Sequence, residues 1–489
     1  MSSGSSEAYA STLAKVISAS STDTSLTIAL DQPPQLPSKR YTRLLRLLRY
    51  SLLAAYQRLF TLVILLNLIG VGFLRHQSLK TANLDHLATA ASANILVAVL
   101  VRQDCFNNAI YACAWMVPWC FPLRVRRILA RAAYTYGGIH SGAAVAGTAW
   151  FLVFSTLMTL RFVQSGFYKV REVTLTWILF ALLAIICLLA LKPVRLRYHN
   201  TFEATHRLLG WAAILIFWTQ LLFLLHHTAL VALQPFCKVL VRTPSFWFLA
   251  ATTMFIIQPW LRLRLWNFKA EYLSDHALRL HFDHPVRCHS CLSISTSPLR
   301  EWHPFATFPT SRPSMKQPCT SMVVSDAGDW THKLIQSNSS PADLEQNNRN
   351  TYRTVRFWVK GTTTAGVLSL SSMFSRVVIV TTGSGVGPAL STLTHKPKGQ
   401  VARLIWSSRS PLNTFGQSML DEVERVDPDA VIIDTSAMGR PDLVRVAWLL
   451  YKQIEADAVF VLSNRTVTKK MVYSLESRGI PAFGPIWDS

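Results

Sequence analysis

The sequence predicts a six-helix membrane domain, a small antiparallel β-barrel and a doubly wound nucleotide-binding domain, in that order along the chain. Three observations support this prediction. Half of the 489 residues are hydrophobic, only 15% are charged and the mean hydropathy is +0.26, a composition that is too apolar for an ordinary soluble protein; the chain is also too long for one domain. After residue 269, short alternating segments replace the long apolar ones. From residue 377, strands alternate with helices.

Long apolar segments fill the first half of the chain. The basic clusters between them fall on alternate loops, and the positive-inside rule therefore places both termini of a multi-pass membrane protein in the cytoplasm. The net charge of +23 indicates a lipid bilayer rather than nucleic acid as the partner, because the basic residues gather at the ends of apolar runs. The six spans are predicted at 52–73, 84–101, 140–160, 174–191, 207–228 and 245–260.

Two segments of this half are not expected to span. The Ser/Thr-rich start lacks the basic and apolar regions of a signal peptide, and we expect it to be disordered. The aromatic segment 111–122 is interrupted by Pro118 and is expected to lie along the inner membrane interface. The predicted domains are a cytoplasmic N-terminus at 1–44, the membrane domain at 45–268, the barrel at 269–372 and the nucleotide-binding domain at 373–489.

Strand patterns define the two C-terminal domains. Barrel strands are expected at 277–282, 291–296, 320–325 and 352–359, and a flexible insertion at 337–350. Parallel strands are expected near 377–382, 401–406, 430–434 and 457–463. Cys288 and Cys291 form a lone CxxC pair, which indicates either metal or redox use or two incidental strand residues.

The stretch from Val377 to Leu390 carries the clearest functional signal. A β-branched strand runs into a glycine turn and then into a helix, so that free N–H groups at the helix start face an anion. A proline in the first helical turn fits, because its missing N–H is one that the helix does not use. This pattern predicts a nucleotide phosphate site, with an ordinary tight turn as the alternative. The turn is Gly383, Ser384, Gly385, Val386, Gly387 and Pro388.

Two histidines open the third and fifth spans. His140 and His206 both fall at the cytoplasmic end of the predicted topology. Ionisable residues inside spans are functional candidates, and two imidazoles facing each other across a bundle can supply both axial ligands of a haem. Small residues around His140 leave room for a macrocycle or for close helix packing. The alternative is that both histidines cap their helices at the interface.

This order of parts resembles the ferric reductase and NADPH oxidase superfamily, from about residue 45 to the end. The motifs that carry the resemblance are His140 and His206, segments 301–307 (EWHPFAT) and 328–331 (GDWT), and the glycine turn. The sequence is most similar to the fungal branch whose members occur alone or fused behind an adenylation domain. The resemblance implies a six-span haem domain followed by a ferredoxin-reductase-like module that binds FAD and NADPH or NADH.

The resemblance places the flavin against His303, Pro304 and Phe305. The family usually has a hydroxyl residue next, but this chain has Ala306, and Thr307 is the expected substitute. The second flavin-phosphate segment, 360–366, keeps only its glycines. Trp487 is expected either to cover the flavin or to be a simple C-terminal packing residue.

The nicotinamide end also departs from the family pattern. Ser408 and Arg409 follow the second strand, where a guanidinium could bind the 2′-phosphate of NADPH in a fork; the alternative is a solvated loop arginine. Relatives often carry a thiol beside the nicotinamide, whereas segment 461–465 (VLSNR) has none.

The sequence predicts one inner haem b at most. Two-haem relatives place a second histidine about 20 Å along each ligand helix, where this chain has Phe154 and Thr219. We therefore expect an integral-membrane NAD(P)H-dependent flavoprotein oxidoreductase that passes electrons from FAD to one haem or to a cytoplasmic-side acceptor, whose identity the sequence leaves open. The alternative is a catalytically degenerate membrane scaffold of the same fold, serving fungal secondary metabolism or redox homeostasis. A transporter is disfavoured, because the spans show no charged pathway.

Overall fold

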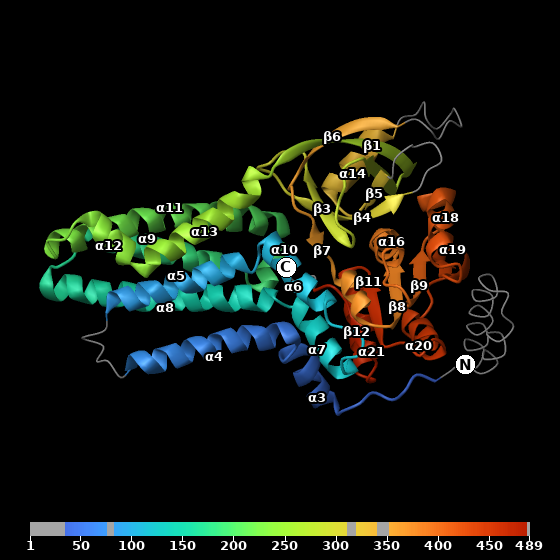
Figure 1. Ribbon diagram of the computed structural model, residues 1–489, viewed down its shortest axis with the longest axis horizontal. Helices are drawn as coiled ribbons and strands as arrows, with labels where there is room; N and C mark the ends of the chain where they lie inside the picture. Colours follow the sequence, from blue (N-terminus) through green and yellow to red (C-terminus); the bar gives the residue numbers. More distant parts are fainter. Residues whose placement is uncertain (1–34, 76–82, 311–318, 340–351, 487–489) are drawn as a thin grey trace. The chain divides into compact units, whose positions relative to one another are not determined.

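The computed structural model describes residues 35–75, 83–310, 319–339 and 352–486 (Figure 1). The chain forms two compact units. The helical unit holds residues 52–107 and 135–262; the sheet unit holds the N-terminal segment through Ser51 together with residues 108–134 and 263–487. Trp487 and most of the expected insertion lie outside the described residues.

The helical unit consists mainly of long apolar helices, and each predicted span coincides with one of them. Their bounds are α4 Ala55–Arg75, α5 Leu84–Leu100, α8 Gly137–Ser165, α9 Val170–Leu189, α11 His199–Val231 and α13 Pro244–Leu261, with short helices α10 Lys192–Arg197 and α12 Phe236–Arg242. Among the described helices, α4, α8, α9 and α11 are long and apolar enough to cross a membrane. Two further spans arise only if α5 with the following helix α6, Asp104–Trp115, and α12 with α13 each count as one bent span.

Helix α8 packs closely against α4. A Cβ atom at Gly138 would stand 2.2 Å from the Tyr56 carbonyl oxygen, and one at Gly142 would stand 3.0 Å from that of Phe60. The glycines around His140 therefore serve close packing of these two helices. Buried aromatic residues of α8 and α11, including Phe151 and its stacked neighbour Phe154, form the core of the unit.

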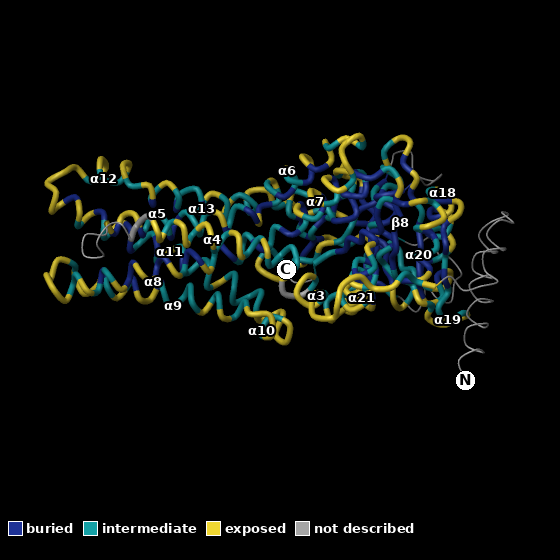
Figure 2. The backbone as a smooth tube through the Cα atoms, turned by 90° about the horizontal axis from the view of Figure 1, so that it is seen from below, coloured by how far each residue is buried: buried dark blue, intermediate teal, exposed yellow. Residues whose placement is uncertain are grey.

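Apolar side chains also cover the outside of the helical unit. Leu66 on α4 is 59% exposed and Ile69 is 58% exposed. Figure 2 shows exposed residues along α8 and α9, whereas buried residues concentrate around the central strand of the sheet unit, β8. A monomeric soluble protein rarely exposes such an extended apolar surface.

The first domain of the sheet unit is a closed antiparallel barrel. Its strand order is β4-β5-β2-β1-β6-β3-β7, and an additional β3–β4 pairing closes it. Its core contains Phe268, Leu280, Ile294 and Phe357. The strands are β1 Arg264–Ser274, β2 Ala277–Phe282, β3 Ser290–Ser295, β4 His303–Thr310, β5 Cys319–Ser325, β6 Arg353–Val359 and β7 Thr364–Ala365, with helix α14 at Asp329–Asn338.

The second domain is a parallel five-stranded sheet in the order β10-β9-β8-β11-β12. The chain moves outward from β8 to β10 and then returns to the other side of β8, so that β8 and β11 flank a topological switch point. The strands are β8 Arg376–Thr382, β9 Val401–Ser408, β10 Val431–Asp434, β11 Ala458–Leu462 and β12 Ala482–Phe483. The helices are η2 Val367–Met373, η3 Gly383–Gly385, α16 Val386–Thr394, α17 Pro411–Phe415, α18 Gln417–Val426, α19 Thr435–Met438, α20 Leu443–Gln453 and α21 Arg465–Glu476.

Segments from the first half of the chain pack on this sheet unit. They are α3 Arg43–Leu47, the end of α6, and α7 Leu123–Tyr134. Arg126 is buried and donates from Nη1 to the Met373 carbonyl at 2.8 Å, and Arg127 donates to the Asp457 carbonyl at 2.8 Å. These arginines belong to a cluster that the sequence assigns to a basic loop. The structure shows that they also anchor that loop to the sheet unit.

Candidate functional site

A cleft of about 1760 Å³ runs through the sheet unit, and we call it the cofactor cleft. Its walls include the glycine turn, part of β4, the start of η2 and the carboxyl ends of β8, β9 and β11. In parallel sheets, ligands bind beyond the carboxyl ends of the strands at the switch point, which is where this cleft lies.

The glycine turn leaves no space for a side chain at Gly385. A Cβ atom at Gly385 would stand 2.0 Å from Thr381 Oγ1 and 3.1 Å from the Leu462 carbonyl oxygen. Gly383 adopts φ +53°, which favours glycine, and its carbonyl accepts a hydrogen bond from Trp406 Nε1 at 2.9 Å. The backbone is therefore held close to the cleft without side chains in between, as a phosphate cradle requires.

All the predicted nicotinamide-nucleotide residues line the cofactor cleft: Gly383, Ser384, Gly385, Gly387, Pro388, Ser408 and Arg409. Ser408 is buried, whereas Arg409 is exposed. The hydroxyl groups of Ser384 and Ser325 are 2.7 Å apart and connect the turn to barrel strand β5.

The opposite wall contains only part of the predicted flavin segment. Pro304, Phe305 and Ala306 line the cleft. The His303 ring instead stacks on Trp330, with ring centroids 4.1 Å apart and 20° between the planes. Thr307 is buried away from the cleft lining, and its Oγ1 donates to the Ser290 carbonyl at 3.0 Å. In this arrangement the Thr307 hydroxyl does not take the place of the one missing at Ala306.

A cysteine lies beside that position. Cys291 lines the cleft and pairs with Ala306 in the β3–β4 register. Burial raises the pKa of the Cys291 thiol to about 11, so the thiol is protonated at neutral pH and is a poor nucleophile. Within the described ranges no group of three or more His, Cys, Asp or Glu side chains could hold a metal ion.

Three parts of the cleft lining are absent from the sequence predictions. Residues 367–369 begin η2 directly after the predicted flavin-phosphate segment 360–366, and Ser369 is buried there. Arg440 and Lys470 contribute positive charge. Residues 367–369 have a sequence signal, a serine shortly after the glycine that ends the predicted phosphate segment. Arg440 and Lys470 have none, because only the folded sheet brings their loops to the cleft.

The helical unit contains the predicted histidine pair. The rings of His140 on α8 and His206 on α11 face each other, with centroids 6.2 Å apart and 61° between the planes. His140 Nδ1 lies 2.8 Å from the Ala98 carbonyl oxygen, so the neutral ring donates there and leaves Nε2 available as a ligand atom. This arrangement fits a pair of axial ligands.

His227, another histidine of the helical unit, contacts a carboxylate rather than a second histidine. His227 Nδ1 lies 3.6 Å from the carboxylate of Glu172, which is fully buried, and its ring contacts Phe167 and Tyr168. Buried charges require such partners. His227 therefore serves a local polar cluster and forms no second pair with α8.

A closed antiparallel barrel followed by a parallel sheet, with one cleft running along both, is the organisation of ferredoxin-reductase-like modules. The sequence comparisons identify relatives of another name. Residues 367–489 match the family model described as the C-terminal domain of adenylate-forming reductase 03009. The chain is similar to adenylate-forming reductase 03009 of Coprinopsis cinerea, with 38% identity over 454 residues, covering 93% of this chain and 42% of the relative.

Adenylate-forming reductase 06235 of the same fungus is similar to the same degree, with 38% identity over 457 residues and 93% and 42% coverage. The chain thus spans about two fifths of the length of these curated relatives. Among solved structures, a ferredoxin NADP+ reductase from Neisseria gonorrhoeae with bound FAD and NADP has a TM-score of 0.33 at 11% identity, covering 46% of this chain and 98% of that one. That score is too low to define the fold, which rests on the strand order.

Proposed function

We propose that this chain is an integral-membrane, NAD(P)H-dependent flavoprotein oxidoreductase. The observation that carries the proposal is the cofactor cleft, in which the glycine turn and the β4 segment 304–306 face one continuous cavity. The relatives named adenylate-forming reductases support a reductase activity. The wider likeness to ferric reductases rests on the sequence motifs.

Different residues of the cleft would bind the nicotinamide nucleotide and the flavin. Backbone N–H groups at the start of α16 face the nucleotide phosphates, and Arg409, with Arg440 on the same cleft, supplies charge for a 2′-phosphate. Phe305 and Ala306 form the wall for the flavin. When bound, NAD(P)H supplies a hydride and FAD passes its electrons on singly. The protein positions both and keeps water away from their contact.

Two observations support membrane integration. The apolar side chains of α4 are exposed in the helical unit, as they would be toward lipid. In addition, the predicted cytoplasmic segments before the first span, between the second and third spans and after the last span all belong to the sheet unit. One-sided placement of these segments, as the positive-inside rule predicts, would produce that grouping.

A bound haem is a second candidate feature, favoured by the facing rings of His140 and His206. The neutral His140 would use Nε2 as a ligand, oriented by its bond to Ala98. One haem at this pair would accept single electrons. No second histidine pair links α8 and α11 in the described helices.

One spectroscopic experiment tests the proposal. The full chain is purified in detergent, supplied with FAD and haem, and its absorption spectrum is recorded with and without NADPH under anaerobic conditions. We expect a flavin band that bleaches on NADPH addition. If neither cofactor stays bound, the oxidoreductase proposal is refuted and the degenerate scaffold is supported.

The haem assignment has its own test. His140→Ala and His206→Ala should each abolish the Soret band, whereas His226→Ala, an exposed histidine on the same helix α11, should leave it unchanged. A normal band in either of the first two variants would refute the ligand assignment without affecting the flavin result.

A further inference from the structure

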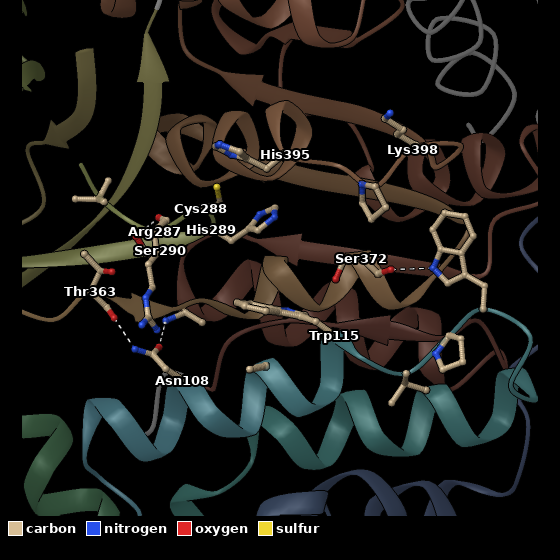
Figure 3. A pocket seen from close by; sticks show the side chains of 17 residues that line it. Asn108, Trp115, Arg287, Cys288, His289, Ser290, Thr363, Ser372, His395 and Lys398 are labelled. Atoms are coloured by element: carbon tan, nitrogen blue, oxygen red, sulfur yellow. Dashed lines mark hydrogen bonds between the residues drawn. The ribbon is translucent and has the colours of Figure 1, made fainter. Parts of the chain in front are cut away.

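A second cavity of about 930 Å³ lies within the sheet unit (Figure 3), and we call it the side pocket. Its walls come from α6 and the turn after it, from residues 286–290 before β3, from β7 and from the α16–β9 loop. It shares only His289 and Ser290 with the cofactor cleft. Its volume lies in the range of small-molecule sites.

The walls of the side pocket are held in place by direct hydrogen bonds. Asn108 Nδ2 donates to the Thr363 carbonyl at 2.8 Å, and Asn108 Oδ1 accepts from the Ala365 N–H at 3.0 Å. Trp119 Nε1 donates to the Ser372 carbonyl at 2.8 Å. These bonds join α6 and the following turn to the barrel and to η2. The cavity is therefore preformed rather than created by a ligand.

Among the described residues, the side pocket is lined by cationic side chains and by no carboxylate. Arg287 and Lys398 are exposed, and the described part of the chain provides no ion-pair partner for either. No Asp or Glu is among the residues that line the cavity. A pocket with unpaired cations and no carboxylate favours an anion.

The rings of Trp115, His289 and His395 lie in the middle of the pocket, between Arg287 and Lys398 (Figure 3). The His289 ring centroid lies 6.2 Å from that of Trp115 and 5.5 Å from that of His395. Burial lowers the pKa of His289 to about 4, so its ring is neutral at neutral pH. His289 Nδ1 is buried without a hydrogen-bond partner, and the residue adopts φ +56°, which is unusual outside glycine. An unpaired ring nitrogen beside an indole suits a flat ligand with a polar edge.

We propose that the side pocket binds a planar organic anion, such as an aromatic carboxylate, between Trp115 and His289 with its charge toward Arg287. Lys398 lies on the opposite side of the pocket (Figure 3). This binding requires neither nicotinamide nor flavin. The proposal therefore does not depend on the proposed redox function. A ligand there would contact His289, which also lines the cofactor cleft.

Isothermal titration calorimetry tests this proposal with 2-naphthoate and its neutral amide, 2-naphthamide. The full-length chain is used in detergent, and binding to empty micelles is subtracted. We expect saturable binding of one naphthoate per chain and binding of the amide that is weaker by about tenfold or more, because charge-assisted hydrogen bonds are lost. Equal affinity for both compounds would overturn the proposal.

Matched variants distinguish the effect of charges in the side pocket from the effect of surface charge in general on naphthoate binding. Arg287→Gln should weaken naphthoate binding by about five- to tenfold and leave amide binding unchanged. Lys398→Met, on the opposite side of the pocket, should have a smaller effect on naphthoate binding than Arg287→Gln. Arg356→Gln and Lys396→Met remove the same charges from exposed residues outside both cavities and should have no effect. Equal losses in the control variants would contradict the proposal. So would unchanged naphthoate binding in Arg287→Gln, because Arg287 lines the side pocket and not the cofactor cleft.

Discussion

The close packing of the glycine turn can be tested by adding one Cβ atom at Gly385. In Gly385→Ala, the new Cβ would stand 2.0 Å from Thr381 Oγ1, a separation that no packed structure tolerates. Thr381 is fully buried in the central strand, so its side chain cannot move into solvent. Overpacking of this kind costs about 1–3 kcal/mol. We therefore expect Gly385→Ala to lower the free energy of unfolding by about 2 kcal/mol and to push the turn toward the cleft.

The neighbouring glycines provide graded controls. A Cβ at Gly387 would meet the Phe308 ring at 3.5 Å, which is ordinary contact, so Gly387→Ala should change stability by less than about 0.5 kcal/mol. Gly383 has open space but φ +53°, so Gly383→Ala should cost about 1 kcal/mol of backbone strain. The predicted order of destabilisation is Gly385 first, Gly383 second and Gly387 last.

A second substitution should rescue Gly385→Ala. Thr381 Oγ1 has no hydrogen-bond partner in the described structure, so Thr381→Ala removes the clashing atom without leaving a polar group unpaired. Unfolding is followed by the thermal transition of the detergent-solubilised chain, and binding is followed by titration with NADP+. We expect a fall of roughly 4–8 °C for Gly385→Ala and recovery of most of it in the double variant. Additive losses in the double variant would refute the steric argument.

Three further predictions follow from named contacts. Arg409→Gln should raise the NADPH concentration needed for flavin bleaching by about tenfold and leave that for NADH unchanged, because only NADPH carries the 2′-phosphate; equal changes for both would contradict that role. The pKa of His289 is about 4 in the folded chain and 6.5 in the unfolded chain. As the pH falls, the imidazole is therefore protonated in the unfolded chain before it is protonated in the folded chain. Stability should therefore be full above pH 6.5, fall by up to roughly 3 kcal/mol as the pH drops to 4, and then level off; the difference should vanish in His289→Gln, as measured by unfolding at each pH. Arg126→Met should destabilise the sheet unit by about 2–3 kcal/mol, because it leaves the buried Met373 carbonyl unpaired, and the exposed control Arg124→Met should not alter the thermal transition.

The parts of the fold that follow local rules were predictable from the sequence. Long apolar runs coincide with helices, and the β-branched strand with its glycine turn occupies the centre of the parallel sheet, because both signals depend on neighbouring residues alone. Strand β4 was not predictable in the same way. It contains Pro304 and Pro309, which ordinarily exclude a central strand, and only closure of the barrel by β3 and β5 explains its pairing.

The site residues also differ in whether they depend on local sequence or on long-range contacts. The turn residues share one short segment and therefore share one cleft. The role of Thr307 depends instead on which face of β4 it occupies. Its position beside Ser290 follows from the register with β3, in which Ala306 pairs with Cys291. The side pocket has no sequence signal at all, because Asn108, Trp115 and His289 come together only when α6 packs on the barrel.

The distribution of histidines limits how far electrons could travel within the proposed function. His140 and His206 can hold one haem, but His227 lies against Glu172 and the positions expected for a second pair are Phe154 and Thr219. One haem leaves much of the length of α8 and α11 without a redox centre, since a 29-residue helix extends about 40 Å. An acceptor bound within the sheet unit needs no such relay. The preformed side pocket, which shares His289 with the cofactor cleft, provides a place for a small molecule within that unit.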